Sequence, residues 1–402
     1  MLSGMAQKLA MHGGQPVRTD AYPAWPLAGA REEELLRQVL ASPHWGANSP
    51  LVGEFERLFA QVHDCEFGIA AANGTVALEM ALHAAGIVAG DEVMVPAHSF
   101  IATATAALRL GAVPVFVDIG RDSYNLDLDK ADAAVSPKTK AVIPVHFGGS
   151  LVDIPRLEEF AARHNLTVIE DAAHAHGAEW NGLRAGSFGV AGVFSFQNSK
   201  VMTAGEGGLV VTNDEALASR ARSFANCGRK EGHGWFEHFD LAPNYRLSGF
   251  QAAVLLAQLE RLTEQIRLRE QNAERLLREI DTPGIAFQQT PQKTIIHSRY
   301  LLVGRVEEET LGVSRDEFVQ AMTAEGIPCS PFYPHPLYRN ALFERHPCRV
   351  ESCPVAEQAC RDSFWLPLRT LMGSEQDTLD IARAIGKIHE VFKPAGASAR
   401  IQ

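Results

Sequence analysis

Between residues 65 and 212, short apolar runs alternate with segments of helical periodicity, and this alternation constrains the fold more than any other feature. The expected strands are 67–71, 92–95, 113–119, 141–145, 166–169, 190–196 and 209–212. Helices are expected between some of them, at 75–85, 99–110 and 154–164. Strands separated by helices form a largely parallel sheet that is covered on both faces. The sequence therefore predicts an α/β domain with a mostly parallel seven-stranded sheet, whose ligands bind at the carboxyl ends of the strands.

The rest of the chain predicts a second, smaller α/β domain, as a length of 402 residues allows. A helix at 215–225 precedes a stretch at 229–245 that has no periodicity and is interpreted as an ordered loop. A long helical pattern then runs from 248 to about 280, followed by a strand at 299–303 and helices at 315–325 and 376–392. We expect a large domain with an N-terminal arm at 1–260 and a small domain at 261–402, with a frayed tail at 394–402.

Composition excludes several functional classes. The net charge of −11 argues against nucleic-acid binding, which needs a clustered basic face. The first residues lack the apolar core of a signal peptide, and no apolar stretch approaches membrane-spanning length, so a cytoplasmic location is expected. The six cysteines include no Cys-x-x-Cys pair; we expect reduced thiols and no metal site.

Two strand ends carry an amine and a carboxylate. Lys200 follows the strand-like run 193–199, and Asp171 lies just past the strand 166–169. Taken singly, they would be a solvated surface lysine and a helix-capping aspartate. Together they match pyridoxal 5'-phosphate, which needs a lysine for its Schiff base and an aspartate to keep its pyridine nitrogen protonated. We therefore predict this cofactor, with Lys200 and Asp171 as catalytic residues.

A phosphate site is indicated at the turn 73–75, between the first strand and its helix. Gly74 permits a tight turn, and the helix that begins near Thr75 presents free N–H groups and a positive dipole end. A plain turn with a threonine cap would use the same residues. Ser195 lies near the same edge of the sheet, where its hydroxyl is either a further phosphate ligand or a core serine bonded to the backbone.

Aromatic and imidazole side chains follow two other strand ends. Phe100 is placed to stack on a flat cofactor ring, although such a residue is more often part of the core. His174 and His176 form a His-x-His pair that could bind a metal on a strand, but carboxylate partners are missing. We expect His174 near the cofactor's phenolic oxygen and His176 in a structural role.

Three longer motifs complete the pattern, at 170–177, at 195–208 with Lys200 followed by Gly-Glu-Gly-Gly, and at 244–253. From residue 12 to residue 367 the chain resembles the DegT/DnrJ/EryC1/StrS family of pyridoxal-phosphate-dependent aminotransferases. The resemblance implies a type I aspartate-aminotransferase-like fold and a homodimer whose active sites are shared between subunits. It also implies that Asn244 and Arg246 reach the cofactor site of the second subunit.

The resemblance further implies amino transfer from L-glutamine or L-glutamate to the ketone of a cyclitol or sugar, in aminoglycoside-type antibiotic biosynthesis. Tyr333, His335 and Tyr338 are the expected substrate contacts, and Tyr338 replaces a histidine that is common in enzymes of nucleotide-linked keto-sugars. A nucleotide-linked keto-sugar aminotransferase and a synthase of aminated aromatic acids stay open as alternatives. Lys200 argues against a sugar dehydratase, which carries histidine there, and a non-catalytic regulator would leave Lys200 and Asp171 unexplained.

Overall fold

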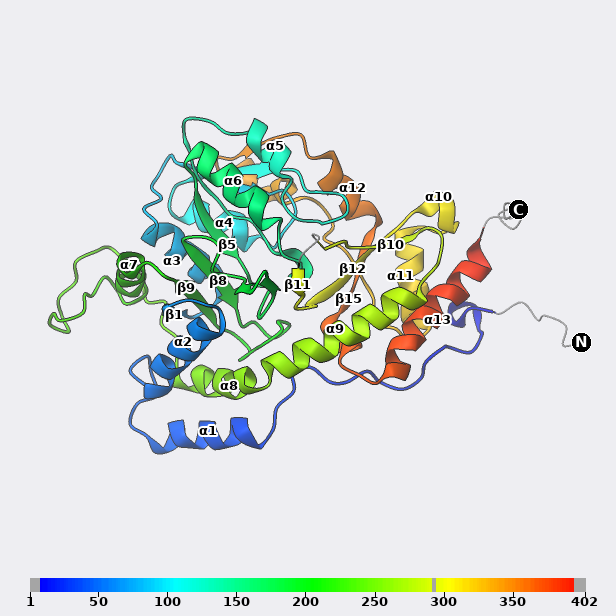
Figure 1. The fold of residues 1–402 in the computed structure, drawn as a ribbon, viewed down its shortest axis with the longest axis horizontal. Coiled ribbons are helices and arrows are strands. Elements are labelled where there is room, and N and C mark those ends of the chain that lie inside the picture. The colour runs from blue at the N-terminus through cyan, green and yellow to red at the C-terminus, as the bar shows by residue number, and fades with distance from the viewer. Residues whose placement is uncertain (1–7, 291–293, 394–402) are drawn as a thin grey trace, which may run out of the picture.

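The computed structural model describes residues 8–290 and 294–393, and its larger part is built on one twisted sheet (Figure 1). Within the described residues the sheet has eight strands in the order β1-β9-β8-β5-β4-β2-β3-β14. These are β1 Phe67–Ala71, β2 Glu92–Pro96, β3 Val113–Val117, β4 Thr139–Val142, β5 Thr167–Asp171, β8 Ala191–Ser195, β9 Gly208–Thr212 and β14 Arg349–Val350. All seven expected strands are present, but the prediction of a seven-stranded sheet is wrong. The eighth strand, β14, has two residues and comes from far along the chain, so it leaves no periodic pattern.

Strand direction determines where the chemistry can gather. Strands β3, β2, β4, β5 and β8 run parallel, whereas β9 is antiparallel to both β8 and β1. The segment between β8 and β9 contains no crossover helix, and strands joined in that way pair antiparallel. In the parallel pair β5–β8, Asp171 lies opposite Val193, two residues before the end of β8. The carboxyl ends of β5 and β8 therefore meet at one edge of the sheet.

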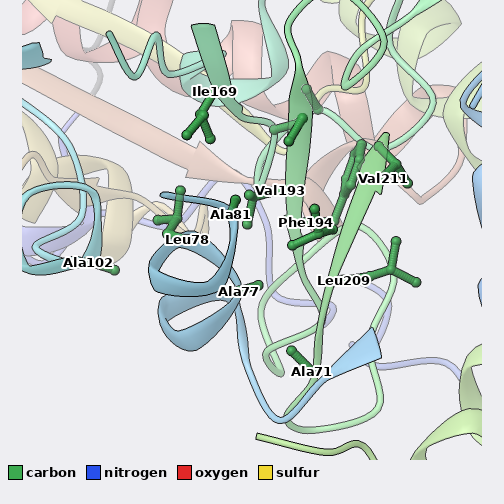
Figure 2. Close-up of a cluster of buried hydrophobic side chains, with 14 of the residues drawn as sticks. Ala71, Ala77, Leu78, Ala81, Ala102, Ile169, Val193, Phe194, Leu209 and Val211 are labelled. Carbon is green, nitrogen blue, oxygen red and sulfur yellow. The ribbon is translucent and has the colours of Figure 1, made fainter. Parts of the chain in front are cut away.

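The helices of the larger part pack against this sheet or against one another. They are α1 Ala30–Ala41, α2 Pro50–Val62, α3 Gly74–Ala84, α4 Ala102–Arg109, α5 Leu128–Ala133, α6 Ile154–His164, α7 Glu215–Ala225 and α8 Gly249–Glu260. Helix α1, for example, packs against α8. Figure 2 shows small side chains of α3, among them Ala77 and Ala81, facing apolar side chains of β8 and β9 such as Val193. At the start of α3, a Cβ on Gly74 would lie only 2.7 Å from the Cβ of Ser195. A glycine at this position therefore lets the N-terminus of α3 approach the end of β8.

The smaller part of the molecule has its own sheet and its own buried apolar cluster. Its sheet, in the order β10-β12-β15-β13, consists of β10 Ile285–Phe287, β12 Leu301–Val306, β15 Ser363–Pro367 and β13 Ser330–Pro331. Its helices are α9 Leu262–Glu279, α10 Glu308–Leu311, α11 Arg315–Ala324 and α13 Glu375–Phe392. Helix α12 Pro354–Asp362 precedes β15 but buries Ala356 and Ala359 in the apolar cluster of the larger part. A third sheet combines β11 Thr294–Ile296, β6 Glu179–Trp180 and β7 Leu183–Arg184. Short 3-10 helices are η1 Ala10–His12, η2 Phe147–Gly149, η3 Leu337–Arg339, η4 Ala341–Glu344 and η5 Leu368–Leu371.

The link between the two parts differs from the expected single helix. Helices α8 and α9 are separated at Arg261, whose side chain turns to bond the backbone oxygen of Leu27 at 2.9 Å and the carboxylate of Glu32. The N-terminal residues Leu9 and Tyr22 pack in the apolar cluster of the smaller part. The division at residue 260 stays a prediction, and the expected frayed tail lies outside the described residues.

Candidate active site

A cavity of about 800 Å³ opens at the edge of the sheet where β5 and β8 end. Its walls come from the turns that follow β1, β2, β5 and β8, together with Tyr300 and Tyr333 from beyond α9. Eight of the side chains expected at the site line it: Gly74, Thr75, Phe100, Asp171, His174, Ser195, Lys200 and Tyr333. The topology thus brings together residues that are scattered over 260 positions of the sequence.

Asp171 is a buried carboxylate in this cavity, 5% exposed. Its Oδ2 accepts a hydrogen bond from the Thr103 hydroxyl at 2.8 Å, and its Oδ1 accepts a longer one from the Ala173 N–H at 3.3 Å. Burial raises the pKa of the Asp171 carboxyl, while the Thr103 hydrogen bond and the charge of Lys200 act against that rise. Among the described residues, no basic nitrogen lies within ion-pair distance of it. A buried carboxylate without a cation is a site that a cationic group of a ligand would complete.

Lys200 lies five residues beyond the end of β8, in a turn fixed by the hydrogen bond from its own N–H to Gln197 O at 2.9 Å. Its Nζ lies 4.6 Å from the centre of the Tyr300 ring, a geometry that stabilises an ammonium by about 0.5–2 kcal/mol. The Ser199 hydroxyl donates to Gln197 Oε1 at 2.8 Å, so it accepts from the Tyr300 hydroxyl at 2.9 Å. Tyr300 therefore contacts both the lysine and the turn that carries it.

The start of α3 forms a candidate anion site. Asn73 caps the helix, its Oδ1 accepting from the Val76 N–H at 3.0 Å. The remaining N–H groups of a first helical turn have no partner within the helix, and here they belong to residues on the cavity wall. Ser195, 8% exposed, adds a hydroxyl beside Gly74. This set of N–H and O–H donors suits the phosphate of the expected cofactor.

The two histidines after β5 differ in their surroundings. His174 accepts a hydrogen bond at Nδ1 from the Gly148 N–H at 3.3 Å, and burial lowers its pKa well below the ordinary value. The neutral ring therefore carries its proton on Nε2, which makes His174 a hydrogen-bond donor at the cavity wall. His176 donates from Nε2 to Ser195 O at 3.0 Å and packs against Phe59 and Phe194, away from the cavity lining.

Phe100 and Tyr333 add two aromatic side chains to the lining of the cavity. The Phe100 ring is 53% exposed, which leaves its face free to cover a bound group. Burial raises the pKa of the Tyr333 hydroxyl, so the hydroxyl stays protonated at neutral pH. Tyr333 thus presents a neutral hydroxyl to whatever the cavity binds.

Four expected site residues lie outside the lining of the cavity. Arg246 donates from Nη1 to Asn226 Oδ1 at 2.8 Å, and Asn244 accepts from the Arg246 N–H at 3.3 Å. The His335 ring contacts the backbone oxygen of its neighbour, and the Tyr338 hydroxyl donates to a glutamate, Glu357, at 2.8 Å. Their proposed roles stay predictions.

Several residues that line the cavity or support its lining were not predicted from the sequence. Gln197, Ser199, Glu206 and Tyr300 line the cavity, and Thr103 bonds Asp171 from α4. Glu206 and Gln197 lie inside the motif that contains Lys200, which was the available signal. Thr103 reads as an ordinary helix residue, and Tyr300 is a hundred positions from Lys200, so only the fold reveals them.

Known proteins match nearly the whole chain, both in sequence and in structure. A model of the DegT/DnrJ/EryC1/StrS aminotransferase family matches residues 26–385. A candidate L-glutamine:3-amino-2,3-dideoxy-scyllo-inosose aminotransferase of Streptoalloteichus tenebrarius is 38% identical, over 96% of this chain and 98% of that one. The L-glutamine:2-deoxy-scyllo-inosose aminotransferase of Streptomyces lividus is 37% identical over the same shares. The crystal structure of 3-amino-5-hydroxybenzoic acid synthase superposes with a TM-score of 0.87 at 35% identity, covering 92% of this chain and 99% of that one.

Proposed function

Because this chain belongs to the DegT/DnrJ/EryC1/StrS aminotransferase family, we propose that it moves an amino group from L-glutamine to the ketone of a cyclitol. The family depends on pyridoxal phosphate, and the cavity around Asp171 and Lys200 is the proposed site of that cofactor. The observation that carries the proposal is the pairing, in one cavity, of a lysine with a buried carboxylate that has no cationic partner among the described residues. This proposed acceptor, an inosose-like ring, agrees with the aminoglycoside-type antibiotic biosynthesis that the sequence predicts.

The residues of the cavity fit pyridoxal phosphate. When bound, this cofactor supplies an aldehyde that condenses with amines and a ring that withdraws electrons from the neighbouring carbon. Asp171 would hold a proton on the ring nitrogen, because a buried carboxylate stabilises a cation beside it. Gly74, Thr75 and Ser195 would bind the phosphate, and His174 would donate its Nε2 proton to the phenolic oxygen.

Lys200 is the proposed acid–base group. Its amine would attach to the cofactor at rest and, once displaced by the amino donor, would take the proton from the donor's α-carbon and deliver it to the C4′ carbon of the cofactor. The lysine becomes an ammonium when it accepts that proton, and the Tyr300 ring at 4.6 Å stabilises this charged form. Phe100 would shield the reacting carbon from water.

The charge of the lining favours a polyol acceptor over a nucleotide-linked one. Among the described residues that this subunit contributes to the cavity wall, Lys200 is the one lysine or arginine, and Glu206 adds a carboxylate to that of Asp171. A diphosphate would need further cations, whereas ring hydroxyls can bond to neutral groups such as Tyr333, Ser199 and Gln197. The likeness to 3-amino-5-hydroxybenzoic acid synthase keeps an aromatic-acid precursor as a second candidate acceptor.

A panel of acceptors tests this function. With L-glutamine as donor, 2-deoxy-scyllo-inosose is expected to react with a kcat/KM about 100-fold or more above that of a TDP-linked keto-sugar or a shikimate-like ketone. Mass spectrometry of the aminated product and of the oxo acid left by the donor provides the measurement, with L-glutamate as the comparison donor. A nucleotide-linked sugar that reacts faster than every cyclitol would refute the proposed acceptor.

The proposed enzyme is a homodimer whose subunits complete each other's sites. Residues 229–245 contain no helix or strand, as expected, and expose Trp235, Phe236 and Leu241 at 62%, 87% and 101%. The loop extends from α7 at the left of Figure 1 and leads into Asn244 and Arg246. Apolar side chains exposed in this way are typical of a surface that a second copy covers.

Among the described helices, none combines the length and the apolar character that a membrane span needs.

Mixed dimers test the shared site. Arg246→Ala and Lys200→Ala homodimers should each be impaired, but their heterodimer should regain activity, because one of its two sites contains both wild-type residues. The arginine would contribute a charge-assisted hydrogen bond, worth about 1.5–3 kcal/mol. Differently tagged subunits, purified as heterodimers, provide the measurement. Arg37→Ala, at an exposed arginine of α1, is the matched control and should leave activity unchanged. Heterodimers without any recovery would place Arg246 in its own subunit's structure.

A further inference from the structure

Two buried hydroxyl groups form a chain that ends on Asp171. Ser99 Oγ lies 2.9 Å from Thr103 Oγ1, which lies 2.8 Å from Asp171 Oδ2. Thr103 is fully buried and Ser99 is 3% exposed. The three residues come from the turn after β2, from the first turn of α4 and from the end of β5, so the chain joins separate elements.

Chemistry fixes the direction of both hydrogen bonds. A carboxylate only accepts, so the Thr103 hydroxyl donates its single proton to Asp171. Thr103 Oγ1 must then accept from Ser99, whose proton points along the chain toward the carboxylate. Hydroxyls aligned in this way polarise one another, which strengthens the last bond.

Thr103 is a helical threonine whose hydroxyl bonds to groups outside its own helix. Such side chains commonly bond back to a carbonyl oxygen of the preceding turn. Thr103 lies in the first turn of α4, and its hydroxyl crosses instead to a strand on the other wall of the cavity. Asp171 Oδ2 is thereby occupied, while Oδ1 holds only the 3.3 Å bond from Ala173 and keeps acceptor capacity.

We propose that Thr103, aligned by Ser99, is a positioning residue that orients the Asp171 carboxylate and holds the shared proton on the cofactor's ring nitrogen. The inference rests on the proposed function, since it needs pyridoxal phosphate at this site. Stabilising the carboxylate anion keeps the proton on the ring. Without the Thr103 hydroxyl, the proton moves toward the carboxylate and the ring withdraws electrons less well.

The test uses pyridoxal phosphate labelled with ¹⁵N in the ring and bound to the full-length enzyme. In Thr103→Val, which keeps the shape and removes the hydroxyl, the ¹⁵N resonance should shift toward that of an unprotonated pyridine. Thr103→Ser, which restores the donor, should keep the wild-type resonance. We expect kcat to fall about tenfold in Thr103→Val with little change in KM.

A double-mutant cycle separates positioning from a general effect on packing. In an Asp171→Asn background, adding Thr103→Val should shift the resonance no further, because the carboxylate on which Thr103 acts is already gone. A Thr103→Val enzyme with the wild-type resonance would overturn the inference, whatever its activity or thermal stability.

Two further outcomes have different meanings for the inference and for the proposed function. Should Thr103→Val fail to fold, Ser99→Ala decides: a smaller shift in the same direction supports the chain, and an unchanged resonance overturns it. Wild-type enzyme that binds no pyridoxal phosphate would instead refute the proposed function itself.

Discussion

Replacing Lys200 with alanine is expected to reduce transamination by about 10⁴-fold or more, because acid–base catalysis by a positioned side chain contributes roughly 10²–10⁴-fold and the covalent attachment is lost as well. The fold and non-covalent cofactor binding should persist, since the donors of α3 and Asp171 act independently of the lysine. Single-turnover kinetics and circular dichroism measure these two effects. Borohydride reduction, followed by mass spectrometry, should fix the cofactor to Lys200 in the wild-type enzyme alone.

Two variants sharpen this experiment. Lys200→Arg keeps a cation beside Tyr300 but offers no deprotonated amine, so it should be as inactive as the alanine variant. Lys140→Ala, at an exposed lysine, is the matched control and should retain full activity. Small primary amines added to Lys200→Ala should restore part of the rate by replacing the missing base. An alanine variant that keeps more than a trace of turnover would exclude Lys200 as the catalytic lysine.

Local patterns predicted the larger part of the fold because its elements are long and strongly patterned. The apolar runs and the helical periodicities located the seven expected strands and helices α3, α4, α6 and α7 to within a few residues, and the likeness to 3-amino-5-hydroxybenzoic acid synthase confirms the expected α/β fold. Two features could not be read in this way. The two-residue strand β14 is defined by its pairing with β3, and the break at Arg261 is set by contacts to Leu27 and Glu32.

The residues of the candidate site also fall into those that a local motif predicts and those that only contacts between distant elements reveal. Lys200, Asp171 and His174 were predictable because each lies in a local motif at or beyond a strand end. Thr103 and Tyr300 act through contacts between elements distant in sequence, and neither residue type is unusual for its element. Asn244 and Arg246 illustrate a third case, since their predicted role depends on contacts with a second subunit and not on contacts within one chain.

Replacing Asp171 with asparagine is expected to slow transamination by about 10²-fold or more while cofactor binding persists, since a neutral amide cannot stabilise a protonated ring nitrogen. The amide oxygen still accepts from Thr103, so the local structure should be kept. The ¹⁵N resonance of the ring nitrogen should report the unprotonated form. Asp153→Asn, at the half-buried N-cap of α6, is a matched control that keeps a capping side chain and should leave both readouts unchanged. An Asp171→Asn enzyme nearly as fast as the wild type would exclude the ring-nitrogen role.

Stability provides a second, independent test of Asp171. Burial raises the pKa of its carboxyl in the folded, cofactor-free protein above the unfolded value of about 3.9. The carboxyl group therefore has no effect on stability below the unfolded pKa. Its destabilising effect grows as the pH rises from the unfolded to the folded pKa, and it stays constant at higher pH. Without cofactor at pH 7, Asp171→Asn should thus melt at the same or a higher temperature than the wild type, even though it is the poorer enzyme. A marked loss of thermal stability in the cofactor-free variant would instead make Asp171 a structural residue.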